Sequence, residues 1–187
     1  ARKLSNTFGK VSVNFGDAIY LDEALERTRP GWKLEAVGAE ARPPWLANTV
    51  NDLARQVATG INSAAAINPV NLVATLLLST ERLAMDERQL ATLMDRYVAL
   101  LKARPYSETV TFPEGDGREW IRYCENMGLV GRYPQVLGDI IALDGTNATL
   151  MTYYRNNIQH LFAVPALIAC LFENSTSMAR RKVIFLA

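Results

Sequence analysis

One segment of the chain, residues 150–172, joins a polar cluster to a long apolar run. The cluster is Tyr-Tyr-Arg-Asn-Asn at residues 153–157, and the run is unbroken over residues 161–172. Such a run predicts a helix buried in a protein core, and it is too short to span a bilayer, which takes roughly 20 residues. Unpaired polar groups in a core cost several kcal/mol. The segment therefore predicts either a ligand site or a buried polar network.

Helical signals dominate the chain after residue 44. Asn68 and Pro69 predict an N-cap followed by a first helical residue, and Asp86 predicts a second N-cap. Gly128 is the expected stop of a helix over residues 117–127. Another helix is expected from Pro44, and the residues that share one of its faces are Trp45, Thr49, Leu53, Val57 and Ile61. The pattern indicates a mostly α fold.

The first 44 residues have a different pattern. Apolar and polar side chains alternate over residues 10–15, which predicts a half-buried strand. Asp22 is the expected cap of a short helix over residues 23–27. Residues 29–44 are rich in proline, glycine and charge, and they predict a linker. The chain begins at Ala1 without a methionine, and we expect it to be a fragment of a longer protein.

Composition excludes several classes of protein. The net charge is +1, so the whole chain has no electrostatic bias toward nucleic acid. The two cysteines, Cys124 and Cys170, lie far apart in apolar helical patterns, which favours reduced, packed thiols over a disulfide framework. No cluster of cysteine, histidine and acidic residues has the spacing of a metal site.

The stretch Phe-Pro-Glu-Gly-Asp-Gly-Arg at residues 112–118 has two interpretations. Its glycines free backbone amides and an arginine follows, as in a loop that holds a phosphate. The same residues are typical of a turn that leads into the helix of Trp120. The turn is the simpler interpretation.

The polar cluster and the lone histidine are also open to two interpretations. His160 has no triad partner in the sequence pattern, although Asp139 and Asp144 lie on a neighbouring element. We favour a hydrogen-bonded interior histidine. Arg155 and Asn156 belong either to a buried network that joins helices or to an anion site built on Arg155, and we favour the network. Residues 161–172 are expected to form a buried core helix.

Several stretches together resemble one family, the bacterial membrane-bound glycerol-3-phosphate acyltransferases. Residues 11–19 (VSVNFGDAI) are similar to the V-x-V-x-F-G-x-P-I/L element that closes the acyltransferase domain, with Ala18 in place of the family's proline. Further matches follow in the same order. They are residues 45–51 (WLANTVN), 68–72 (NPVNL), 98–107 (VALLKARPYS), 138–141 (GDII) and 150–158 (LMTYYRNNI).

The resemblance implies an enzyme that transfers a fatty acyl group from acyl-CoA or acyl carrier protein to the sn-1 hydroxyl of glycerol 3-phosphate. It implies no cofactor, no metal, no nucleic-acid partner and peripheral contact with the cytoplasmic face of the bacterial inner membrane. The family's His-x4-Asp pair is absent here, because the only histidine is His160. We expect this chain alone to be inactive, with Tyr154, Arg155 and Asn156 binding substrate or supporting the site.

The implied fold is a multi-helix C-terminal domain preceded by the terminal strand of an α/β acyltransferase domain. Residues 1–28 are then the end of the α/β domain, residues 29–44 the linker, and residues 45–187 the helical domain. The alternative is a non-catalytic helical module that holds a partner protein or a membrane surface through residues 161–172. The basic triplet at residues 180–182, within a last helix expected from Ser177, has two interpretations: contact with an anionic membrane surface, or a solvated first turn of the helix.

Overall fold

The computed structural model describes residues 9–34, 43–143, 145 and 147–173, and this part of the chain is mostly helical. The helices are α1 (Leu21–Thr28), the short 3-10 helix η2 (Trp32–Leu34), α2 (Pro44–Ser63), α3 (Pro69–Leu77), α4 (Glu87–Ala103), α5 (Gly117–Asn126) and α6 (Ala148–Phe172). The strands are β1 (Ala84–Asp86), β2 (Val130–Tyr133) and β3 (Ile140–Leu143). The predicted mostly α class is confirmed.

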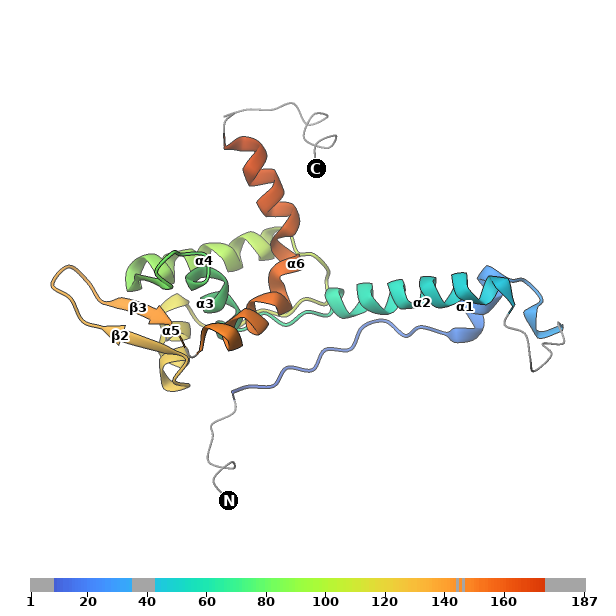
Figure 1. The fold of residues 1–187 in the computed structure, drawn as a ribbon, viewed down its shortest axis with the longest axis horizontal. Helices are drawn as coiled ribbons and strands as arrows, with labels where there is room; N and C mark the ends of the chain where they lie inside the picture. The colour runs from blue at the N-terminus through green and yellow to red at the C-terminus, as the bar shows by residue number, and fades with distance from the viewer. Residues whose placement is uncertain (1–8, 35–42, 144, 146, 174–187) are drawn as a thin grey trace, which may run out of the picture.

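Helices α3 to α6 and one small sheet form the body of the molecule (Figure 1). The sheet has the order β1-β3-β2 and both pairings are antiparallel, so that Ile141 faces Met85 on one side and Arg132 on the other. The core between these elements is aliphatic. Its fully buried side chains include Leu72, Leu77, Leu90, Met94, Ile121, Ile141, Met151 and Ile158.

Helices α3 and α4 begin at the predicted caps Asn68 and Asp86, and α5 begins at residue 117 as expected. The side chain of Asn68 accepts a hydrogen bond from the Asn71 backbone N–H, and the Asn71 side chain accepts from Asn68 in return. Asp86 and Asp116 each accept two backbone N–H groups at the start of α4 and α5. These bonds satisfy donors that the first turn of a helix leaves free. Gly128 ends α5 with a φ of 67°, as expected.

The arm made by α1 and α2 extends away from the body (Figure 1). Helix α2 is confirmed, but its expected apolar face is only partly covered, since Thr49 is its one buried residue and Ile61 is 68% exposed. The reason is that α1 is too short to cover a helix of 20 residues. An exposed apolar strip, which shares Val57 and Ile61 with that face, runs along the helix. We call it the α2 stripe: Ala47, Val50, Ala54, Val57, Ala58 and Ile61.

The predicted strand over residues 10–15 is not formed. Residues 9–20 are extended and run alongside α2 (Figure 1), and the Asn14 side chain donates to the carbonyl of Ala64, at the end of α2 next to the body, at 3.0 Å. The alternating apolar side chains point outward, with Val11 86% and Phe15 88% exposed. A strand needs a neighbour for its backbone hydrogen bonds, and the part of the chain that the structure describes offers none there.

Two smaller expectations near the N-terminus have different outcomes. Helix α1 begins at Leu21, and Asp22 does not cap it but pairs with Lys33 at 2.9 Å. The division of the chain at residues 29–44 stays a prediction, since residues 35–42 lie outside the described part. The expected helix from Ser177 and the basic triplet also lie outside it.

The prediction of a buried helix over residues 161–172 is wrong. Helix α6 runs through Pro165 to Phe172, but Leu161 is the last buried residue. Phe162 packs against Tyr97 of α4 with ring centroids 5.2 Å apart, and none of residues 163–172 is buried. The helix is longer than the body that it packs on, so its end rises clear of the other elements (Figure 1). No helix among the described residues is both long and apolar enough to cross a membrane.

Candidate functional site

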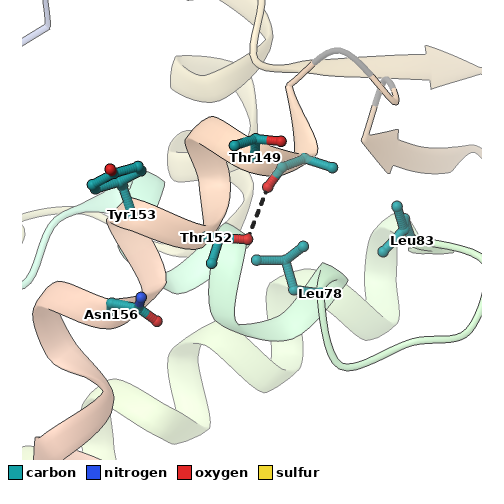
Figure 2. A pocket seen from close by; sticks show the side chains of 7 residues that line it. Leu78, Leu83, Thr149, Thr152, Tyr153 and Asn156 are labelled. Carbon is teal, nitrogen blue, oxygen red and sulfur yellow. Dashed lines mark hydrogen bonds between the residues drawn. The ribbon is translucent and has the colours of Figure 1, made fainter.

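The polar cluster of α6 borders a shallow pocket at the junction with α3. The cavity measures about 360 Å³, and its lining residues are Leu78, Leu83, Ala148, Thr149, Thr152, Tyr153 and Asn156. Figure 2 shows Thr152 beside Leu78, with Leu83 across the opening and Asn156 one turn further along α6. The Thr152 hydroxyl donates to the Ala148 carbonyl at 3.0 Å. The pocket thus has an apolar floor with hydroxyl and amide groups at its edge, the composition of a small polar-ligand site.

Packing on α3 decides which side chains of the cluster reach solvent. Met151, Ile158 and Leu161 form the buried side of α6. On the same side, Asn71 of α3 is 1% exposed and its amide donates to the Tyr154 carbonyl at 2.9 Å. The opposite side of the helix therefore turns outward, which leaves Tyr153, Asn156 and Asn157 exposed.

Arg155 and Asn156 do not belong to a buried network, and that prediction is wrong. The Arg155 Nε and Nη2 groups donate to the Asn156 Oδ1 atom at 3.3 and 3.1 Å, in an exposed contact between neighbours on one helix. Among the described residues, no carboxylate pairs with Arg155. Its guanidinium is charged at all ordinary pH values and keeps donors for an anion. Tyr154 is half-buried and packs on the core, away from these donors.

His160 is hydrogen-bonded within the fold. Its Nε2 atom lies 2.9 Å from the Asn62 carbonyl oxygen, and its ring meets Tyr106 edge-on with centroids 5.2 Å apart. Among the described residues no carboxylate contacts it, since Asp139 pairs with Arg132; Asp144 lies outside the described part. The structure therefore bears out a hydrogen-bonded interior histidine.

The loop at residues 112–118 serves the fold. The Asp116 side chain accepts from the Arg118 and Glu119 amides, and Asp95 accepts from the Gly117 amide at 2.8 Å. Carboxylates of the chain thus occupy the amides that a phosphate would need. The interpretation as a turn into α5 is confirmed.

An arginine with three acidic partners was missed by the sequence analysis. Arg132 of β2 donates to Glu125 at 2.7 Å, to Asp139 at 2.7 Å and to Glu87 at 2.9 Å. We call these four residues the Arg132 cluster. The hydrogen bond from Arg132 lowers the pKa of the Glu87 carboxyl. The cluster joins α4, α5 and the sheet. Glu125 and Asp139 lie seven residues to either side of Arg132, but on different elements, and Glu87 lies 45 residues before it, so no helix or strand period predicts the cluster.

The two thiols have opposite surroundings. Cys124 is 0% exposed, and burial raises its pKa to about 12. Cys170 is exposed on the end of α6, so the prediction that it is packed is wrong. A buried thiol with a raised pKa is unreactive, so Cys124 is a packing residue, as predicted. Within the described residues, no three histidine, cysteine or acidic side chains lie close enough to hold a metal ion.

Comparison with known proteins shows which family the chain belongs to. Residues 1–187 match the family described as glycerol-3-phosphate acyltransferase C-terminal region. A glycerol-3-phosphate acyltransferase of Pseudomonas fluorescens strain Pf-5 is 50% identical over 181 residues, which is 97% of this chain and 22% of the relative. Those of Ectopseudomonas mendocina strain ymp and Pseudomonas aeruginosa strain LESB58 are 49% and 50% identical over the same length. The chain spans 22% of the length of these relatives.

Proposed function

Because the chain belongs to the glycerol-3-phosphate acyltransferase family, we propose that it is the C-terminal region of an enzyme that acylates glycerol 3-phosphate. The reaction moves a fatty acyl group from acyl-CoA or acyl carrier protein to the sn-1 hydroxyl of glycerol 3-phosphate. The observation that carries this proposal is the 50% identity over 97% of the chain to a relative that bears that name. The relatives are bacterial, which supports a place at the cytoplasmic face of the inner membrane.

Within such an enzyme, this region packs on the catalytic portion. The α2 stripe supports that role, because it is an apolar strip on one side of a helix whose other side carries polar residues such as Asp52 and Arg55. One-sided strips of this kind suit a protein partner. The outward apolar side chains of residues 11–15 lie beside the same arm and support the same docking.

The chain alone should not transfer acyl groups. A His-x4-Asp pair supplies the general base in the family that the sequence resembles, and the one histidine of this chain, His160, is hydrogen-bonded to the Asn62 carbonyl oxygen. We expect no acylated product above background when the purified 187-residue chain is mixed with acyl-CoA and glycerol 3-phosphate. The control is the whole polypeptide that contains this region. Product formation by the isolated chain would overturn this part of the proposal.

Arg155 is the best candidate of this region for contact with the substrate. Its guanidinium is hydrogen-bonded to Asn156, which lines the pocket, and an arginine with no carboxylate partner among the described residues suits the phosphate of glycerol 3-phosphate. In the whole polypeptide, we expect Arg155→Ala to raise the KM for glycerol 3-phosphate about tenfold, the loss of one charge-assisted bond, with little change in kcat.

The matched control for this experiment is Arg96→Ala, which removes an exposed arginine from α4. It should leave the KM unchanged. Thermal unfolding of each variant separates binding from folding. A lowered melting temperature for Arg155→Ala with an unchanged KM would assign Arg155 to the fold and not to the substrate.

A further inference from the structure

The pocket at the junction of α3 and α6 is lined entirely by uncharged side chains. Its polar groups are hydroxyls and one amide, from Thr149, Thr152, Tyr153 and Asn156, and the other lining residues are leucine or alanine. An anionic group placed among them would lose water without gaining a cation, which is costly. The guanidinium of Arg155 is not part of the lining. The pocket therefore suits a neutral ligand.

The polar groups at the edge of the pocket are oriented by bonds within α6. Arginine only donates hydrogen bonds, so the contact with Arg155 turns the amide oxygen of Asn156 toward it and leaves the Nδ2 hydrogens for a ligand. The Thr152 hydroxyl donates to the Ala148 carbonyl, so its oxygen remains as an acceptor. A donor and an acceptor thus lie one turn apart on the same helix (Figure 2). A secondary amide, with its carbonyl and its N–H, is complementary to that pair.

The apolar wall across the opening is held in a strained conformation. Leu83 has a φ of 51°, in the left-handed region that residues other than glycine seldom occupy. Its N–H donates to the Thr80 carbonyl at 3.2 Å, and its own carbonyl accepts from the Leu143 N–H at 2.9 Å, so the fold fixes this conformation. Strain that the surrounding structure imposes in this way is concentrated at sites that clamp a ligand. Leu83 would contact an apolar part of the ligand.

Size and polarity argue against other parts of the substrates in this pocket. Its volume of about 360 Å³ is near the lower end of the roughly 300–1,000 Å³ of ligand pockets, so it holds a segment of a ligand and not a whole acyl donor. A fatty acyl chain would leave the hydroxyl and amide groups at the edge without partners. The phosphate of glycerol 3-phosphate would meet no cation in the lining. A neutral chain with both amide and apolar groups fits all three conditions.

We propose that this pocket binds the pantetheine arm of the acyl donor. Acyl-CoA and acyl carrier protein share that arm, a neutral chain with amides, a hydroxyl and a dimethyl-substituted carbon, which ends in the sulfur that carries the acyl group. Its amides are complementary to Asn156 and Thr152, and its methyl groups to Leu78 and Leu83. The inference rests on the proposed function and names the part of the donor that this site takes. With the phosphate of glycerol 3-phosphate at Arg155, the two substrates would lie side by side, as acyl transfer requires.

Filling the pocket tests the proposal in the whole polypeptide. Thr149 lines the pocket and is exposed, so Thr149→Trp places a large ring there without displacing a buried side chain. The arm would lose its hydrogen bonds and apolar contacts, and we expect the KM for acyl-CoA and the KM for acylated carrier protein each to rise about tenfold or more. The KM for glycerol 3-phosphate should stay the same. The matched control is Thr92→Trp, at an exposed threonine of α4, which should leave all three values unchanged.

The two donors distinguish the arm from what carries it. A rise in KM for acyl-CoA alone would place the nucleotide part of CoA in the pocket. A rise for the carrier protein alone would place a surface of that protein there. Either result would overturn the assignment to pantetheine, and so would unchanged KM values for both donors.

A smaller substitution keeps the proposal testable if the tryptophan variant does not fold. Thr152→Val retains the shape of the side chain and removes the hydroxyl oxygen that would accept from the arm. We expect the KM for both donors to rise about fivefold, the loss of one hydrogen bond. Thermal unfolding shows that the variant is folded. Unchanged donor KM values in a folded Thr152→Val protein would contradict the proposal.

Binding without transfer separates this inference from the proposed function. The probe is a thioether analogue of acyl-CoA, which cannot release its acyl chain, and calorimetry measures its Kd for the whole polypeptide. A Kd that Thr149→Trp raises supports the pocket even if no transfer to glycerol 3-phosphate is detected, and the proposed function then fails alone. Acyl transfer by the unchanged protein, together with an equal Kd in the variant or no binding of the analogue, would overturn the inference and leave the proposed function standing.

Discussion

Gly117→Ala should destabilise the protein by about 3 kcal/mol or more, through a clash between two main chains. A Cβ atom on Gly117 would lie 2.7 Å from the Cα atom of Ala91, and it would also meet the Ala91 carbonyl oxygen. Both contacts involve the backbone of α4, which no rotamer change can move. The start of α5 would have to shift away and would lose the hydrogen bond from the Gly117 amide to Asp95. Urea unfolding followed by circular dichroism measures the change.

Gly60→Ala is the matched control, because Gly60 is also a helical glycine but has no atom within 4 Å of its would-be Cβ. Alanine stabilises an open helical position by up to about 1 kcal/mol. We therefore expect opposite signs for the two substitutions. A loss below about 1 kcal/mol for Gly117→Ala would mean that α4 and α5 separate more easily than their contact implies.

Arg132→Met should lower the free energy of unfolding by about 2 kcal/mol near neutral pH. Glu87, Glu125 and Asp139 would then converge on a position that no longer carries a positive charge. All four side chains are no more than 33% exposed, so water screens their repulsion only in part. Met keeps most of the side-chain volume, which limits the effect to charge and hydrogen bonding.

The loss of stability in Arg132→Met should depend on pH if it comes from charge, whereas a loss caused by a packing defect would not. In the unchanged protein the pKa of Glu87 is lowered below 4.5 by Arg132, so its contribution is full above pH 4.5 and is lost as the pH falls through the lowered value. In the variant the largest lowering cause is gone, while burial and the charge of Asp139 still raise the pKa of Glu87 and only the more weakly acting Arg118 lowers it. Acidification then relieves repulsion in the variant.

The difference in unfolding free energy between the two proteins should therefore shrink below pH 4.5. Chemical unfolding near neutral pH and below that value measures it. Arg55→Met is the control, because the Arg55 side chain is 74% exposed in its pair with Asp52, and such pairs contribute less than about 0.5 kcal/mol. A difference that stays constant with pH would assign the effect of Arg132 to packing.

The helix starts were predictable because their causes are local. Asn68, Asp86 and Asp116 bond to amides two or three residues further on, so a short stretch of sequence contains the whole interaction. Strands β1 and β2 were missed for the opposite reason. They are three and four residues long, and they pair with β3. The paired residues are separated by 7 to 58 positions in the sequence.

The candidate site was located by the sequence, but its chemistry was not. The cluster at residues 153–157 does border a pocket. The sequence could not say that Asn156 is exposed and Arg155 half-buried, because that depends on which side of α6 meets α3. The buried amide of Asn71 and the buried side chains of Met151 and Ile158 decide that orientation.

By itself, the sequence determined where α3, α4 and α5 begin, which family the chain resembles, and that the one histidine is not part of a His-x4-Asp pair. Those properties depend on residues close together in the chain or on the residues present. Only the tertiary structure decided which apolar residues are buried. Residues 161–172 and the α2 helix are apolar enough for a core, but burial requires a neighbour, and the neighbours end at Phe162 and at α1. The surface left uncovered on α2 carries the proposal for protein docking.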